Sequence, residues 1–163
     1  MQILVKVIRW TSLVSLPVFL LAIPNSPAIA GDIGSCADSL ILDGVAKSSA
    51  AAACSDALEP RLLASCVQDI KANTDIKGDD ALQSCYRVRR PNELASCVID
   101  ISDSLKQVKS GMALDNCRRS LLPAQYAECT LDLTSIEISS EKAMKSCIAA
   151  EFTPSQVNPE TAQ

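Results

Sequence analysis

The spacing of the cysteines constrains the fold of this chain more than any other feature of the sequence. The intervals between successive cysteines alternate between 18–20 and 12 residues, so a period of about 31 residues runs through the chain. Such a period is typical of an array built from one repeated structural unit. The eight cysteines are Cys36, Cys54, Cys66, Cys85, Cys97, Cys117, Cys129 and Cys147.

A proline divides each of the three 12-residue intervals into equal halves, which gives the pattern Cys-x5-Pro-x5-Cys at Pro60, Pro91 and Pro123. Proline is favoured at the first position of a helix and disfavours helix in the residue before it. Apolar residues follow each proline at intervals of three and four, as in Leu63 and Val67, which is the periodicity of a helix. The sequence therefore predicts an all-α fold: a solenoid-like array of about four short helix pairs that meet at proline corners. The longer intervals hold Gly44, Gly78 and Gly111, which we expect to break the helices there.

Two disulfide schemes fit the cysteine pattern. Pairing across the proline corners joins residues 54–66, 85–97 and 117–129, and it leaves two cysteines over at the ends of the array. Pairing across the longer intervals joins 36–54, 66–85, 97–117 and 129–147, and it leaves none over. The period would place a ninth cysteine where the chain has Glu160, and the second scheme predicts this absence. We therefore favour the second scheme, while the first remains open.

The N-terminus has the three zones of a secretory signal peptide. Lys6 and Arg9 precede an apolar run over residues 10–23, and Ala28-Ile29-Ala30 forms a cleavage site. We expect residues 1–30 to be a removed signal, residues 31–153 to form one disulfide-linked helical domain, and residues 154–163 to be a disordered tail. The mature protein is then secreted or periplasmic, meets a membrane only during export, and lies where disulfides are stable.

The composition argues against most kinds of chemistry. The chain has no histidine and no Cys-x-x-Cys motif, which disfavours nucleophile–histidine catalysis, redox catalysis and the usual zinc sites. Removing residues 1–30 takes away two of the 15 basic residues and none of the 19 acidic ones, so the formal charge falls from −4 to −6. This charge argues against nucleic-acid binding. We expect no enzyme activity, no metal and no cofactor, and a hydrolase is the least favoured class.

The arginines of the mature chain are segregated from its lysines. All six arginines lie at or beside the proline corners, whereas the lysines lie in or near the longer intervals. Because arginine suits bidentate recognition of carboxylate or phosphate, we expect a binding patch for an unknown protein or an acidic ligand. An alternative interpretation is that these side chains only offset helix dipoles or pair with acids such as Glu59 and Glu93. The residues of the expected patch are Tyr86, Arg87, Arg89, Arg90, Arg118 and Arg119.

These features predict an exported, non-catalytic binding or scaffold module. Its alternative is a carrier of an apolar small molecule or lipid, because the mature core must be aliphatic and poor in aromatic residues. The predicted signal with the Cys-x5-Pro-x5-Cys units, as in residues 85–97, resembles a group of exported Cys-repeat helical proteins of cyanobacterial type. The resemblance covers most of residues 36–154 and implies no activity.

Overall fold

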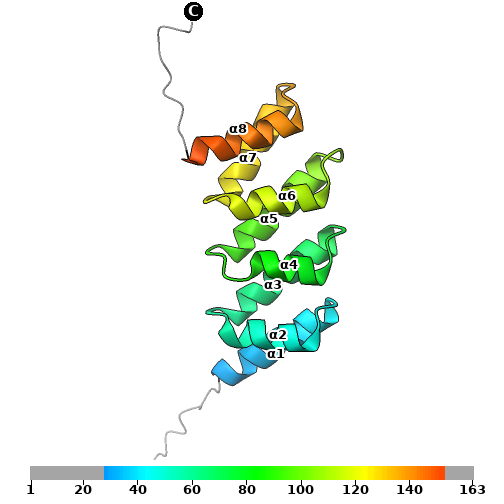
Figure 1. Ribbon diagram of the computed structural model, residues 1–163, viewed down its shortest axis with the longest axis vertical. Coiled ribbons are helices and arrows are strands. Elements are labelled where there is room, and N and C mark those ends of the chain that lie inside the picture. Colours follow the sequence, from blue (N-terminus) through cyan, green and yellow to red (C-terminus); the bar gives the residue numbers. More distant parts are fainter. Residues whose placement is uncertain (1–27, 153–163) are drawn as a thin grey trace, which may run out of the picture.

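The structure is a computed structural model that describes residues 28–152 of the chain. Within this range the chain forms eight helices and no strand, which confirms the all-α prediction (Figure 1). The helices are α1 (Ala28–Leu42), α2 (Lys47–Asp56), α3 (Pro60–Asn73), α4 (Gly78–Cys85), α5 (Pro91–Ser104), α6 (Ser110–Arg119), α7 (Pro123–Ser135) and α8 (Ser140–Phe152).

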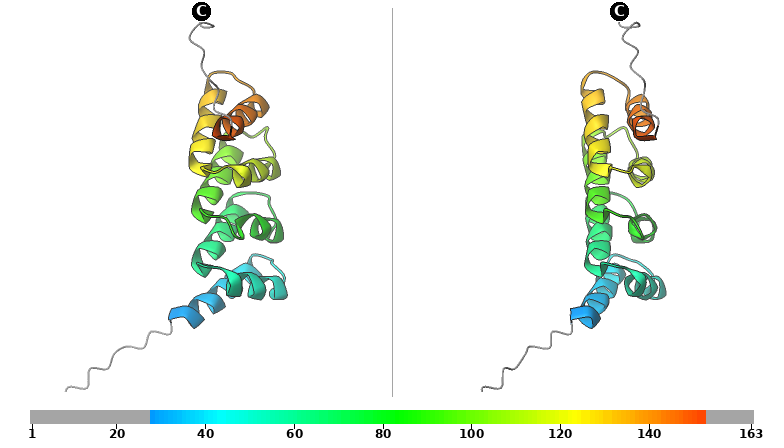
Figure 2. Two further views of the ribbon diagram at one scale, coloured as in Figure 1. Left: turned by 60° about the vertical axis from the view of Figure 1, so that its left-hand side comes forward. Right: turned by 90° about the vertical axis from the view of Figure 1, so that its left-hand side faces the viewer.

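The helices are arranged in two layers along one axis. The odd-numbered helices pack on one another in the order α1, α3, α5, α7 and form a continuous column (Figure 2, right). Each even-numbered helix packs mainly on the odd-numbered helix before it and touches its neighbours in its own layer over few residues. The even-numbered layer is therefore held in place chiefly through the odd-numbered layer.

Proline fixes the start of three helices, as the sequence predicts. Pro60, Pro91 and Pro123 are the first residues of α3, α5 and α7. The residue before each proline has nearly the same extended backbone, with φ between −136° and −132°. Proline sterically excludes the helical conformation from the residue before it, so each even-numbered helix must end before its corner.

Four disulfides join the two layers within residues 28–152, and they follow the favoured scheme across the longer intervals. Each bridge links an odd-numbered helix to the next even-numbered helix, with Cα–Cα distances of 5.9 to 6.0 Å. Among the described residues no cysteine is free, and seven of the eight are buried, whereas Cys129 is half-buried. The bridges are Cys36–Cys54, Cys66–Cys85, Cys97–Cys117 and Cys129–Cys147.

The core of the column changes character at its last helix. α3 and α5 bury Leu, Val and Ile at equivalent positions, whereas α7 has Tyr126 and Thr130 where α5 has Leu94 and Val98. Burial raises the pKa of Tyr126 to about 12 because the phenolate is poorly solvated in the core. Neither hydroxyl has a hydrogen-bond partner of good geometry within the described residues.

Two of the three glycines expected to break helices do not do so. Gly44 lies between α1 and α2 with φ +88°, a conformation that favours glycine. Gly78 and Gly111 instead lie in the first turns of α4 and α6, so that part of the prediction is wrong. At Gly78 a Cβ would lie 2.3 Å from the carbonyl oxygen of Asp43, whereas at Gly111 it would meet nothing within 4 Å. Gly78 therefore allows close packing between neighbouring units.

Most of the predicted signal lies outside the described residues, as does the predicted tail at 154–163. Residues 28–30 form the start of α1, so cleavage after Ala30 would remove the first three residues of that helix. Within residues 28–152 no helix has both the length and the apolar character needed to cross a bilayer.

Candidate binding site at the proline corners

The loops of the array lie along two opposite edges. Three proline corners, at residues 57–59, 86–90 and 120–122, lie along one edge, which is on the left in Figure 1. The segments that join an odd-numbered helix to the next even-numbered helix lie along the other edge, on the right. We call these the corner edge and the connection edge, and we number the corners from one to three in chain order.

The second corner differs from the other two in length and backbone. It has five residues rather than three, because α4 ends at Cys85, whereas α2 and α6 continue for two residues past their cysteines. Arg87 has φ +61°, in the left-handed region that non-glycine residues rarely occupy. This residue terminates α4 early and turns the rest of the corner outward.

Contacts with the preceding unit hold Arg87 in this conformation. Its guanidinium forms an ion pair of 2.6 Å with Asp56 at the end of α2 and lies 5.1 Å from the centre of the Tyr86 ring. The Tyr86 hydroxyl also donates a hydrogen bond to Asp56. This hydrogen bond and the charge of Arg87 lower the pKa of Asp56 below its ordinary value. Asp56 therefore ties the first corner to the second and neutralises Arg87.

Two other corner arginines also have acidic partners. Arg61 pairs with Asp32 of α1 at 2.6 Å, and Arg90 pairs with Glu93 one helical turn away at 3.2 Å. These pairs are exposed, and exposed ion pairs contribute little to stability. Their consequence is electrostatic, because they reduce the positive charge that the corner edge offers to a ligand.

Arg89 and Arg118 are exposed and form no ion pair within the described residues. Both line a cleft of about 590 Å³ between the second and third corners, which we call the arginine cleft. No acidic side chain of residues 28–152 lines this cleft, and its apolar lining includes Leu121 and Leu122. The site therefore combines uncompensated guanidinium groups with apolar surface.

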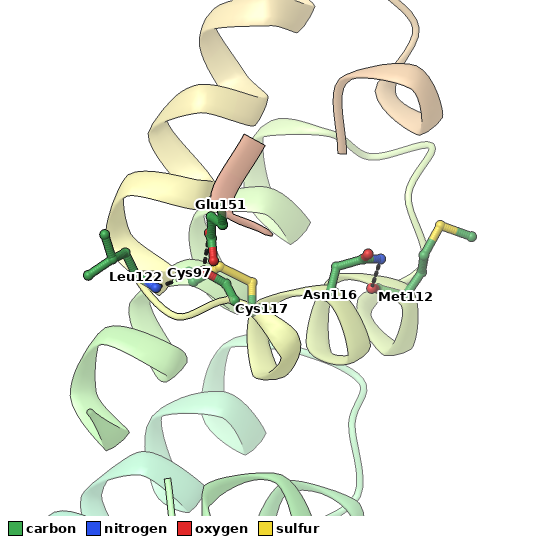
Figure 3. Close-up of a disulfide and its surroundings, with 7 residues drawn as sticks. Cys97, Met112, Asn116, Cys117, Leu122 and Glu151 are labelled. Carbon is green, nitrogen blue, oxygen red and sulfur yellow. Dashed lines mark hydrogen bonds between the residues drawn. A yellow bond between two sulfur atoms is a disulfide. The ribbon is translucent and has the colours of Figure 1, made fainter. Parts of the chain in front are cut away.

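Glu151 at the end of α8 fixes the third corner. Its carboxylate accepts hydrogen bonds from the Ser120 hydroxyl at 2.5 Å and from the Leu121 backbone N–H at 2.6 Å. The Ser120 hydroxyl oxygen in turn accepts a hydrogen bond from the Leu122 N–H at 3.0 Å. Figure 3 shows Glu151 and Leu122 beside the Cys97–Cys117 disulfide. The far wall of the arginine cleft is thus held by both a bridge and a carboxylate.

A second cleft, of about 570 Å³, lies between the first and second corners. We call it the apolar cleft, because its lining includes Leu58, Leu62, Val88 and Pro91. Arg87, Val88 and Arg89 line both clefts, so the two adjoin across the second corner.

The structure brings together part of the predicted patch and separates the rest. Four of its arginines line the arginine cleft, but Tyr86 lines the apolar cleft instead. Arg119 lies at the end of α6, is exposed, and lines neither cleft. The two corner leucines, Leu58 and Leu121, are absent from the predicted patch. Each stands two residues before a corner proline, and that register is the sequence signal that could have revealed them.

Within the described residues no cluster of potential side-chain ligands could hold a metal ion. Comparisons with protein-family models, with curated proteins and with solved structures found no match to this chain.

Proposed function

We propose that this chain is an exported, non-catalytic binding module that takes an acidic ligand at its corner edge. The observation that carries the proposal is the arginine cleft, in which Arg89 and Arg118 are exposed and without acidic partners. Guanidinium groups pair with carboxylate or phosphate through charge-assisted hydrogen bonds, and interfaces are enriched in arginine.

Export is supported by the covalent structure and by the N-terminal sequence. Four disulfides within residues 28–152 indicate an oxidising compartment, because thiols stay reduced in the cytosol. The basic start, apolar run and Ala28-Ile29-Ala30 site favour delivery there through a cleaved signal peptide. Secretion to the medium and retention in a periplasm are both compatible with this proposal.

The geometry favours a surface that binds a partner over a carrier of apolar molecules. A carrier needs an enclosed cavity lined by aliphatic side chains. The two clefts at the corner edge are instead bordered by exposed side chains, since Leu58 is fully exposed and Leu121 is 63% exposed. Both are also lined by arginine. An array with one chemically distinct edge suits an extended partner.

A charge comparison between the two edges tests the proposal. The oxidised protein is titrated with fluorescent poly-L-glutamate at low salt, alongside the double variant Arg89→Gln/Arg118→Gln. We expect the variant to bind about tenfold more weakly, because two charge-assisted contacts are lost. Added salt should weaken binding of the unmodified protein.

The matched control is Lys109→Gln/Lys142→Gln, which removes two exposed, unpaired cations near the connection edge. Its affinity should match that of the unmodified protein. Equal losses in both double variants would mean that the protein attracts polyanions through overall charge, and the proposal would then fail.

A further inference from the structure

One position of each corner is directed to solvent throughout the array. Two residues before each corner proline stand Leu58, Arg89 and Leu121, and all three are exposed. We call them the corner tips. Along the corner edge their order is apolar, basic, apolar.

Nothing in the fold requires leucine at the two outer tips. A fully exposed leucine contributes no buried surface to folding. Six large hydrophobic side chains of the described residues are exposed, and Leu58 and Leu121 are the two that line the clefts beside Arg89. Their placement is explained by contact with something outside the chain.

We infer that the corner edge recognises an extended peptide segment in which one acidic side chain lies between two apolar side chains. This inference rests on the proposed function and names its ligand class. Arg89 and Arg118 bind the carboxylate in the arginine cleft, while one apolar side chain packs against Leu58 and the other against Leu121. The exposed Glu59 lines the apolar cleft, so an acidic side chain is disfavoured at that end.

The packing of the array sets the spacing of these side chains. Packed helices lie about 8–10 Å apart, so successive corner tips are separated by roughly that distance. An extended peptide advances about 3.3 Å per residue, so it passes about three residues from one tip to the next. The expected pattern is apolar, two residues of any kind, acidic, two residues of any kind, apolar.

The second corner keeps the tips in register. Asp56 holds Arg87 in its left-handed conformation, and this conformation positions Val88 and Arg89 between the two clefts. Arg87 is thereby engaged with its own chain, and the unpaired Arg89 is the tip that meets the ligand.

Three labelled 13-residue peptides test the inference by fluorescence polarisation on the oxidised protein. The first has glutamate at its centre, leucine three residues away on each side, and serine elsewhere. The second has serine in place of both leucines, and the third has glutamine in place of the glutamate. We expect the first to bind about tenfold more tightly than either of the others, because both kinds of contact contribute.

Two single variants locate the apolar contacts. Leu58→Ser and Leu121→Ser should each weaken binding of the first peptide by about three- to tenfold. Both leucines are exposed, so neither change should alter the melting temperature. The matched control is Ile136→Ser at the connection edge, where the isoleucine is 67% exposed, and it should leave the affinity unchanged.

The outcomes separate this inference from the proposed function. If the first two peptides bind equally and both need Arg89 and Arg118, the leucines play no part and the inference fails while the proposed function stands. If the protein binds phosphatidylglycerol vesicles or inorganic phosphate but none of the peptides, the ligand is not a peptide and the inference also fails. If no anion binds, both fail.

Discussion

The two edges of the array use their aliphatic side chains in opposite ways. At the connection edge, Val45, Ile76, Leu105 and Val108 turn inward and are at most 9% exposed. At the corner edge, the leucines at the first and third tips turn outward, and the basic side chains there are arginines. The connection edge therefore contributes to the core, whereas the corner edge leaves apolar and basic groups available to a partner.

This difference indicates which surface is free to evolve for binding. A loop that closes the core cannot change its side chains without a loss of stability. The corners are held by other means, namely the proline at each helix start, the disulfides behind them, and the carboxylates of Asp56 and Glu151. Their exposed tips can therefore vary at little cost to folding.

Removal of the Cys97–Cys117 bridge should have the largest effect on this contrast, because the bridge holds α6 on α5. Replacing both cysteines with serine should lower the free energy of unfolding by about 2–5 kcal/mol, as measured by chemical denaturation. The single change Cys97→Ser should leave Cys117 as the thiol that iodoacetamide labels. Labelling of Cys85 instead would support pairing across the proline corners and contradict the structure.

Truncation of one aliphatic side chain on each edge tests the contrast directly. Ile76→Ala should cost about 2–4 kcal/mol, because the side chain is buried and leaves a cavity. Leu58→Ala should change stability by less than about 0.5 kcal/mol, because nothing packs against an exposed tip. Thermal unfolding followed by circular dichroism measures both, and similar losses in the two variants would remove the distinction between the edges.

Two glycines near the connection edge refine the role of that edge in packing. Gly78→Ala should destabilise the protein by about 1–3 kcal/mol, because its Cβ would collide with the backbone at Asp43. Gly111→Ala should instead stabilise it by about 0.5–1 kcal/mol, since alanine favours helix and meets no obstacle there. Denaturant midpoints of the two variants should therefore move in opposite directions, and a shift of both in one direction would contradict the packing described here.

A pH titration probes the tie between the first and second corners, and its effect should be the smallest. The folded pKa of Asp56 lies below its ordinary value of 3.8, so its contribution to stability is present above about pH 4 and is lost as the pH falls further. The difference in melting temperature between the unmodified protein and Asp56→Asn should therefore shrink below pH 4. A difference that stays constant down to pH 2.5 would show that the carboxylate charge does not matter there.

Much of the architecture follows from short-range rules in the sequence. The prolines fix where three helices begin, and the alternating cysteine intervals with Glu160 at the vacant position favour the pairing that the structure shows. These features are predictable because proline geometry and the cysteine period act locally or repeat in every unit. The segregation of arginine to one edge is predictable for the same reason.

Features that depend on contacts between units are not predictable in this way. The left-handed backbone at Arg87 depends on Asp56, which is 31 residues away, and the anchoring of the third corner depends on Glu151, which is 30 residues from Leu121. The same limit applies to Gly78, whose small size is needed because a carbonyl of the preceding unit approaches it. The sequence shows which arginines share an edge, but only the fold shows that Arg87 and Arg90 are neutralised.

The most direct test maps a bound peptide onto both edges in one experiment. Methyl-labelled protein is titrated with the peptide that carries glutamate between two leucines, and chemical-shift changes are followed by NMR. We predict changes at the methyl groups of Leu58, Val88 and Leu121, with none at Val108 or Ile136 on the connection edge. Changes centred on the connection edge, or spread evenly over both edges, would contradict the assignment of the corner edge as the binding surface.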